Sequence, residues 1–133
     1  VSLITDSTAG FLMRLGFIKK VIVGADRVAN DVFYNKIGTY SLAVLAREND
    51  IPFYVAAPSS TFDPEAWEGS VEIEMRSPEE LLYIGRERTP NAPSDVKVLN
   101  LAFDATPMEY VTAFITEKGI FEPPFLMEEV LID

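Results

Sequence analysis

The sequence predicts a single Rossmann-like α/β domain, with a mostly parallel sheet flanked by helices in three layers. Short runs rich in Val, Ile, Leu and aromatic residues alternate with helical stretches, as they do in parallel α/β sheets. The run Val21-Ile22-Val23 is apolar throughout, which is typical of a strand buried on both faces. The 133 residues are enough for one hydrophobic core without disulfides. These observations together favour one α/β domain spanning residues 1–133.

The expected elements follow one another in a regular order. We predict strands at 1–5, 20–24, 52–57 and 96–101, and helices at 8–15, 38–49, 78–84 and 107–118. The segment 59–70 is predicted to be a loop with one helical turn. Residues 71–75 alternate like an edge strand or hairpin arm, and 86–95, which contains two prolines, is a predicted loop.

Two of the predicted helices carry clear start signals. The segments Ser77-Pro78-Glu79-Glu80 and Thr106-Pro107-Met108-Glu109 each place a hydroxyl at the N-cap, proline next and glutamate at the third helical position. This is the capping-box arrangement, which satisfies backbone donors at a helix start. Gly119 supplies the matching stop for the second helix.

Composition excludes several kinds of partner and chemistry. The chain has no cysteine and no histidine, so catalysis would use carboxylates, lysine, tyrosine or hydroxyls. The net charge of -10 disfavours nucleic acid and anionic membrane surfaces, because the only basic cluster is the pair Lys19-Lys20. No apolar run approaches the roughly 20 residues that span a bilayer. We therefore expect a soluble, cytoplasmic protein with no nucleic-acid or membrane partner. Because the chain begins at Val1 inside an apolar run, we also expect a processed or truncated product.

Polar residues that follow the predicted strands are the first candidates for a site, since ligands bind beyond the carboxyl ends of strands in open α/β sheets. Asp26 follows the strand at 20–24, and Gly24-Ala25 keep bulk away from it. It is our first candidate for a general acid/base, a role that requires apolar surroundings. Pairing with Arg27, or capping of the next helix, is an equally good interpretation from position alone.

Asn35 and Lys36 form a second candidate, immediately before the predicted helix at 38–49. A free lysine beside exposed backbone amides at a helix start is suited to an anion. The alternative is a solvated lysine beside an ordinary loop asparagine. Asp104 is a third candidate, and a structural role in its turn is at least as good an interpretation as a ligand contact.

Three motifs occur in an order and spacing that resemble the methylthioribose-1-phosphate isomerase family: VIVGADR at 21–27, NKIGTY at 35–40 and PFYVAAP at 52–58. The resemblance covers nearly the whole chain and corresponds to the C-terminal half of the family. Ribose-1,5-bisphosphate isomerases and the regulatory subunits of translation initiation factor 2B share much of the pattern. Asp26-Arg27 with Tyr40 resembles the methylthioribose enzymes more closely.

The resemblance implies that Asp26 is the general acid/base and that Asn35 and Lys36 bind a phosphorylated sugar. It implies conversion of 5-methylthioribose 1-phosphate to 5-methylthioribulose 1-phosphate, in methionine salvage, without a metal or organic cofactor. The alternatives are a non-catalytic subunit related to initiation factor 2B, a ribose-1,5-bisphosphate isomerase and a stand-alone binding module. The family is dimeric, and the apolar tail at 121–132 agrees with a homodimer.

The sequence departs from the family in two ways. The family pairs its aspartate with a cysteine from the preceding half of its chain, and it carries an arginine-containing phosphate loop there. Neither is present in this sequence. We therefore expect a piece that is inactive without its own N-terminal half. In addition, Phe33-Tyr34 replaces small residues that the resemblance puts beside the active site.

Overall fold

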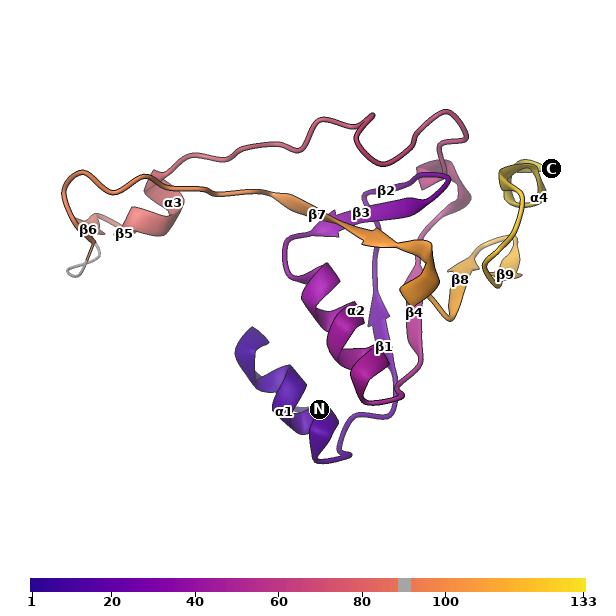
Figure 1. Ribbon diagram of the computed structural model, residues 1–133, viewed down its shortest axis with the longest axis horizontal. Helices are drawn as coiled ribbons and strands as arrows, with labels where there is room; N and C mark the ends of the chain where they lie inside the picture. The colour runs from indigo at the N-terminus through magenta and orange to yellow at the C-terminus, as the bar shows by residue number, and fades with distance from the viewer. Residues whose placement is uncertain (89–91) are drawn as a thin grey trace.

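The computed structural model describes residues 1–88 and 92–133 and contains two main sheets (Figure 1). The four-stranded sheet has the order β1-β4-β8-β9. Its strands β1 (Val21–Val23), β4 (Phe53–Ala56) and β8 (Ala113–Thr116) are parallel, and β9 (Gly119–Phe121) returns antiparallel to β8. The β-branched and aromatic residues of these short runs suit a pleated, buried surface.

The three-stranded sheet is antiparallel and has the order β2-β3-β7. It consists of β2 (Arg27–Val28), β3 (Val32–Lys36) and β7 (Phe103–Pro107). Along β3, Phe33 enters the main core, whereas Val32 and Tyr34 enter a second cluster with Ala29 and Ala66. Successive strand residues point to opposite faces, and both faces of β3 are covered. This explains why its first three residues are all apolar.

Two helices lie beside each other, and the second of them lies next to β1 (Figure 1). The first is α1 (Ala9–Arg14), which follows the 3-10 turn η1 (Asp6–Thr8). The second is α2 (Thr39–Glu48), whose buried residues Thr39, Ala43 and Ala46 recur at the spacing of one helix face. The small alanines allow α2 to approach β1, β4 and β7 closely.

The centre of the main core is a group of aromatic rings. Phe33, Phe53 and Phe114 are fully buried, and the Phe33 ring lies 6.3 Å from Phe53 and 6.0 Å from Phe114. Phe62, just after the 3-10 turn η2 (Ser59–Thr61), meets Phe114 edge-on at 5.6 Å. Burying each such side chain stabilises the fold by about 1.5–3 kcal/mol.

The tail packs on this core. The Phe125 ring lies 5.6 Å from Phe114, and α4 (Met127–Leu131) buries Met127 and Val130. Leu126 and Ile132 stay exposed. Leu131 is exposed as well, so the tail packs Phe125 beside Phe62 but leaves several large apolar side chains open to solvent.

Residues 71–88 and 92–101 form the two sides of an arm that extends away from the two sheets (Figure 1). It carries α3 (Glu79–Leu82) and a hairpin of β5 (Tyr83–Ile84) and β6 (Glu87–Arg88). At the base the two sides are joined by a Met75–Leu101 bridge, and the Arg76 amide donates to the Asn100 carbonyl at 2.8 Å. The predicted loop at 86–95 includes residues 89–91, which lie outside the described residues.

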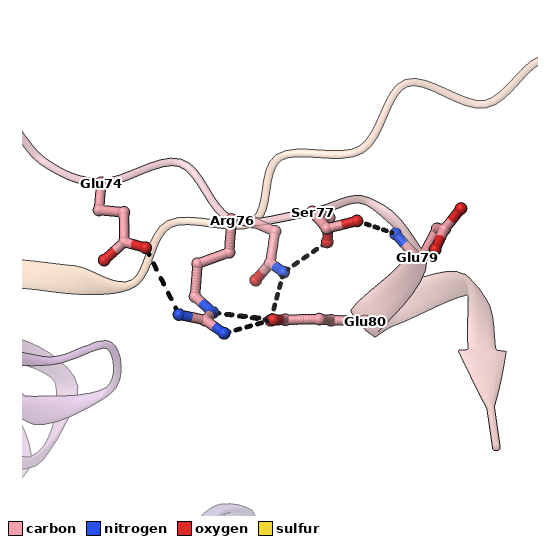
Figure 2. A network of polar contacts seen from close by, with 6 residues as sticks. Glu74, Arg76, Ser77, Glu79 and Glu80 are labelled. Atoms are coloured by element: carbon pink, nitrogen blue, oxygen red, sulfur yellow. Dashed lines mark hydrogen bonds and ion pairs between the residues drawn. The ribbon is translucent and has the colours of Figure 1, made fainter.

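A charged network fastens the arm beside this bridge (Figure 2). The Arg76 guanidinium lies between Glu74 and Glu80, and its Nε donates to both Glu80 carboxylate oxygens at 2.9 Å. Asn100 Nδ2 donates to Glu80 Oε2 at 3.0 Å. The Ser77 hydroxyl accepts a hydrogen bond from the Glu79 amide at 3.2 Å, which is one half of the predicted capping box. The other half is not formed, because the Glu80 carboxylate pairs with Arg76. The helix predicted at 78–84 is accordingly short.

Several predicted elements are confirmed and others are wrong. The strands at 20–24 and 52–57, the helices at 8–15 and 38–49 and the helical turn within 59–70 are confirmed. Residues 1–5, 71–75 and 96–101 form no strand in the described chain. A strand needs a ladder partner and a face to bury. Residues 71–75 and 96–101 meet only at the single Met75–Leu101 bridge, and much of the apolar surface stays open, with Leu3 100% exposed and Leu99 79%.

The helix predicted at 107–118 is also wrong. Thr106 is buried in β7 opposite Phe33, and Pro107 pairs with Val32. One 3-10 turn follows, η3 (Met108–Tyr110), and then the β-branched and aromatic residues of β8 pair with β4. Gly119, with φ +138°, turns the β8–β9 hairpin instead of ending a helix. Sheet pairing and burial therefore override the local capping signal.

The α/β class is confirmed as a mixed parallel and antiparallel sheet structure with helices. The expectation of a mostly parallel sheet holds only for β1, β4 and β8. No helix of the described residues is long and apolar enough to cross a membrane.

Replacing Arg76 by Gln should return the pKa of Glu80 toward its ordinary value. The Arg76 hydrogen bonds, with that of Asn100, hold the Glu80 pKa low. The ionised carboxylate therefore stabilises the base of the arm fully at pH values above the ordinary pKa of glutamate. This stabilisation is lost as the pH falls through the lowered pKa of Glu80. A carbon-13 NMR titration of the Glu80 carboxyl measures the change. The control is Lys97→Gln, which removes a cation of the arm that forms no ion pair among the described residues. An unchanged Glu80 titration in Arg76→Gln would contradict the prediction.

Candidate functional site

A cleft of about 990 Å³ opens where the carboxyl end of β1 meets α1 and the start of α2. Val23 and Gly24 form its floor at the end of β1, while Phe11 and Leu45 line it from the two helices. Its wall contains Asn35 together with two cations, Lys36 and Arg14. Such a combination of apolar walls and a few polar groups is typical of a site for a small anionic molecule.

A second hollow of about 320 Å³ lies against Pro123, Pro124 and Met127. No lysine or arginine lines it, so it is a poorer site for an anion.

Asn35 and Lys36 lie at the end of β3, where the chain turns into α2. Asn35 Nδ2 donates to the Thr39 hydroxyl at 2.9 Å, and that hydroxyl donates to the Lys36 carbonyl at 2.7 Å. The Lys36 ammonium is exposed and lies 5.7 Å from the centre of the Phe103 ring. The backbone that carries both residues is therefore held locally, while the ammonium remains accessible.

The helix start beside them is already capped. Asp104 Oδ2 accepts hydrogen bonds from the Gly38 amide at 2.8 Å and the Tyr40 amide at 3.1 Å. Gly38 has φ +106°, so the N-cap position adopts a backbone conformation that favours glycine and offers no capping side chain of its own. The prediction that the amides of this helix start are open to an anion is therefore wrong in part, because an internal carboxylate occupies two of them.

Burial raises the pKa of Asp104, although hydrogen bonds from the Tyr40 and Gly38 amides work in the opposite direction. Its Oδ1 atom is buried and has no hydrogen-bond partner among the described residues. A raised pKa means that the fold favours the protonated carboxyl. The stability contributed by the protonated Asp104 carboxyl is complete at pH values below the ordinary pKa of aspartate. It is lost as the pH rises through the raised pKa of Asp104.

Asp26 lies just past β1 and is exposed. Its backbone amide donates to the Tyr34 carbonyl at 2.8 Å. Pairing with Arg27 is wrong, because Arg27 instead bonds Asp63 at 3.1 Å, and capping of a helix is wrong, because β2 follows. The Asp26 side chain makes no hydrogen bond or ion pair within residues 1–88 and 92–133. It is two residues beyond the cleft-lining Gly24 and is not itself part of the lining.

Phe33 and Tyr34 do not face the cleft. Both are buried, Phe33 in the main core and Tyr34 in the second cluster. The replacement of small residues by Phe33 and Tyr34 therefore adds no bulk to the cleft lining.

Sequence reasoning missed two other charged groups. Arg14 reaches the cleft from α1, and the Glu117 carboxylate accepts from the Ser59 amide at 2.9 Å and from the Ser59 hydroxyl. The Ser59 hydroxyl and amide lower the pKa of Glu117. Arg14 lies on the exposed side of a helix, and Ser59 and Glu117 are brought together only by the β4–β8 pairing, so no local pattern signalled either. No group of three or more acidic, His or Cys side chains suited to a metal occurs in the described part of the chain.

Comparison with known proteins gives a consistent result. A model of the initiation factor 2 subunit family matches residues 1–123. A Methanosarcina acetivorans protein, provisionally named methylthioribose-1-phosphate isomerase, is 61% identical over 132 residues, which are 99% of this chain and 37% of that protein.

Two solved structures are also similar. The first is translation initiation factor eIF-2B subunit delta from A. fulgidus, with a TM-score of 0.92 and 52% identity, covering 98% of this chain and 38% of that one. The second is 5-methylthioribose 1-phosphate isomerase from Pyrococcus horikoshii OT3, with a TM-score of 0.90 and 49% identity, covering 98% and 37%. The chain thus spans little more than a third of the relatives that it matches.

Replacing Gly38 by Ala should lower the free energy of unfolding by about 1–2 kcal/mol, because an L side chain is strained at positive φ. A Cβ at this position would meet nothing within 4 Å, so the cost is conformational and not steric. Urea denaturation measures the change. Gly24→Ala is the matched control, since its Cβ would lie 4.0 Å from the Ala56 carbonyl in ordinary contact. Equal stability of Gly38→Ala and the unchanged protein would contradict the prediction.

Proposed function

The chain belongs to the initiation factor 2 subunit family, and we propose that it is part of an isomerase acting on 5-methylthioribose 1-phosphate. The product would be 5-methylthioribulose 1-phosphate, formed in methionine salvage. The observation that carries the proposal is 61% identity, over 99% of the chain, to a relative provisionally named for this reaction. The solved P. horikoshii isomerase, at 49% identity, supports the same assignment.

In this proposal Asn35 and Lys36 bind the sugar phosphate. The Lys36 ammonium is accessible in the cleft wall, and Arg14 supplies a second cation there for a phosphate group. The Asn35 amide nitrogen is engaged with Thr39, which leaves its side-chain oxygen to accept a sugar hydroxyl. The apolar walls contributed by Phe11 and Leu45 suit the uncharged end of the same molecule.

Asp26 is the proposed general acid/base. The phosphate on the anomeric carbon prevents simple opening of the sugar ring, so protons must move at the ring oxygen and at carbons 1 and 2. A carboxylate beside the cleft, unpaired within the described residues, is a suitable group for this. Because Asp26 is exposed in this chain, the proposal requires further residues to cover it, and we assign that role to the N-terminal half that the resemblance implies.

The second candidate function is a non-catalytic subunit related to initiation factor 2B. It is favoured by the similarity to the A. fulgidus structure named as subunit delta, with a TM-score of 0.92. Such a protein would bind partner subunits and would not turn over the sugar phosphate.

We also propose a cytoplasmic homodimer with a Rossmann-like, three-layer domain. The arm supports the dimer, because Leu81, Ile84 and Leu99 on it are more than half exposed.

Replacing Asp26 by Asn in the natural full-length protein should lower turnover of 5-methylthioribose 1-phosphate by at least about 100-fold, since a general acid/base contributes 10²–10⁴. Product formation is followed by NMR. Asp50→Asn is the control: Asp50 is an exposed carboxylate at the opposite end of α2, and its φ of 53° is tolerated by asparagine. Normal turnover by Asp26→Asn would refute the site assignment. An inactive unchanged protein that captures an initiation-factor subunit would instead favour the second function.

Light scattering of the natural protein at micromolar concentration should give the mass of a dimer. Leu99→Glu on the arm should shift it toward the monomer, because a buried unpaired charge is unfavourable in an interface. A monomer before substitution would contradict the homodimer and leave the isomerase proposal standing.

A further inference from the structure

The turn that carries Asn35 and Lys36 is fixed from a distant part of the chain. Between the end of β3 and the first turn of α2, the Gly38 and Tyr40 amides both donate to one oxygen of Asp104, on β7. These bonds join residues that are 66 and 64 positions apart in the sequence. Within the turn, the Thr39 hydroxyl accepts from Asn35 and donates to the Lys36 carbonyl, so the local bonds link Asn35 and Lys36 to the segment that Asp104 holds.

The neighbouring residue of the same strand contacts the lysine itself. Phe103 pairs with Lys36 in the β3–β7 register, and the Lys36 ammonium lies 5.7 Å from its ring centre. Asp104 pairs with Asn35 in the next register position. Two consecutive residues of β7 thus face the two proposed substrate-binding residues, and one of them also caps α2.

Asp104 does not line the cleft, and the distances place its carboxylate on backbone amides. Its role is therefore not that of a ligand-binding group. Hydrogen bonds from amides to a carboxylate are stronger than neutral ones, and removing the acceptor leaves both donors of the helix start without a partner. The turn would then be held only by the local bonds of Thr39.

We propose that Asp104 is a positioning residue, which sets the place of Asn35 and Lys36 in the cleft by capping α2 from the adjacent strand. The proposal rests on the isomerase function only in naming the substrate that these residues bind. Loss of the cap should weaken substrate binding more than the chemical step, because Asp26 lies on a different connection, between β1 and β2.

The test compares Asp104→Ala, Asp104→Glu and Asp104→Asn in the natural full-length protein. In Asp104→Ala, KM should rise about tenfold or more while kcat stays within about threefold, because uniform binding is lost. Hydrogen exchange of the Gly38 and Tyr40 amides should become at least about tenfold faster. Asp104→Glu, which keeps the charge but moves the carboxylate, should give the same result and replaces Asp104→Ala if the latter does not fold.

Asp104→Asn should stay close to the unchanged protein in both measurements, because an amide oxygen can accept the same bonds. Thr106→Val is the matched control, since it removes a buried hydroxyl that has no hydrogen-bond partner in the described part of the chain. Thr106 lies two residues along β7 and does not touch the cap. It should change neither KM nor the two exchange rates.

A folded Asp104→Ala or Asp104→Glu with unchanged KM and unchanged exchange would overturn the proposal. So would an Asp104→Asn variant as impaired as Asp104→Ala. If the unchanged protein shows no turnover, the proposed function fails, and the exchange rates of Gly38 and Tyr40 still decide whether Asp104 holds the turn.

Discussion

The pairing of β3 with β7 organises most of this molecule. Five residues of one strand face five of the other, from Val32 with Pro107 to Lys36 with Phe103. Everything between them, which includes α2, β4 and the arm, is closed into a loop by this one ladder. Strand β3 places Phe33 in the aromatic core on one side and Tyr34 in the smaller cluster on the other. Hence β3 connects the core to the cleft wall within a few residues.

How much could be predicted from the sequence depended on the range of the interactions involved. The strand at Val21–Val23 and the helix at Thr39–Glu48 were predictable, because continuous hydrophobicity and helical spacing are local signals. The segment after Thr106 was not, because its capping pattern competes with pairing to β4 and β3, which lie far away in the sequence. The run at 96–101 has strand composition, yet among the described residues it pairs only through the Leu101–Met75 bridge, and composition alone cannot reveal how little of a run will find a partner.

In the candidate site, too, features set by local sequence could be predicted and features set by distant contacts could not. Asn35 and Lys36 could be singled out because they precede a recognisable helix start, and the structure brings both to one cleft. The cap from Asp104 could not be foreseen, since glycine at the N-cap position gives no hint of which side chain will serve instead. Asp26 was identified from its place after a strand, yet its surroundings in this chain are open. The position of a residue is thus easier to predict than its environment, which depends on distant segments.

The hydrogen bond between the Arg76 amide and the Asn100 carbonyl joins the two sides of the arm at its base. Because the two sides are already joined at this point, the residues farther out form a closed loop whose length matters little to the rest of the fold. Doubling or halving a flexible loop changes the closure free energy by only about 0.6 kcal/mol. None of the fully buried side chains of the described chain lies beyond this link, so shortening the outer part of the arm would leave the aromatic core and the register of β7 as they are. The fold of one subunit should therefore tolerate insertions and deletions in this part of the chain, whereas the proposed dimer constrains the exposed Leu81, Ile84 and Leu99 of the arm.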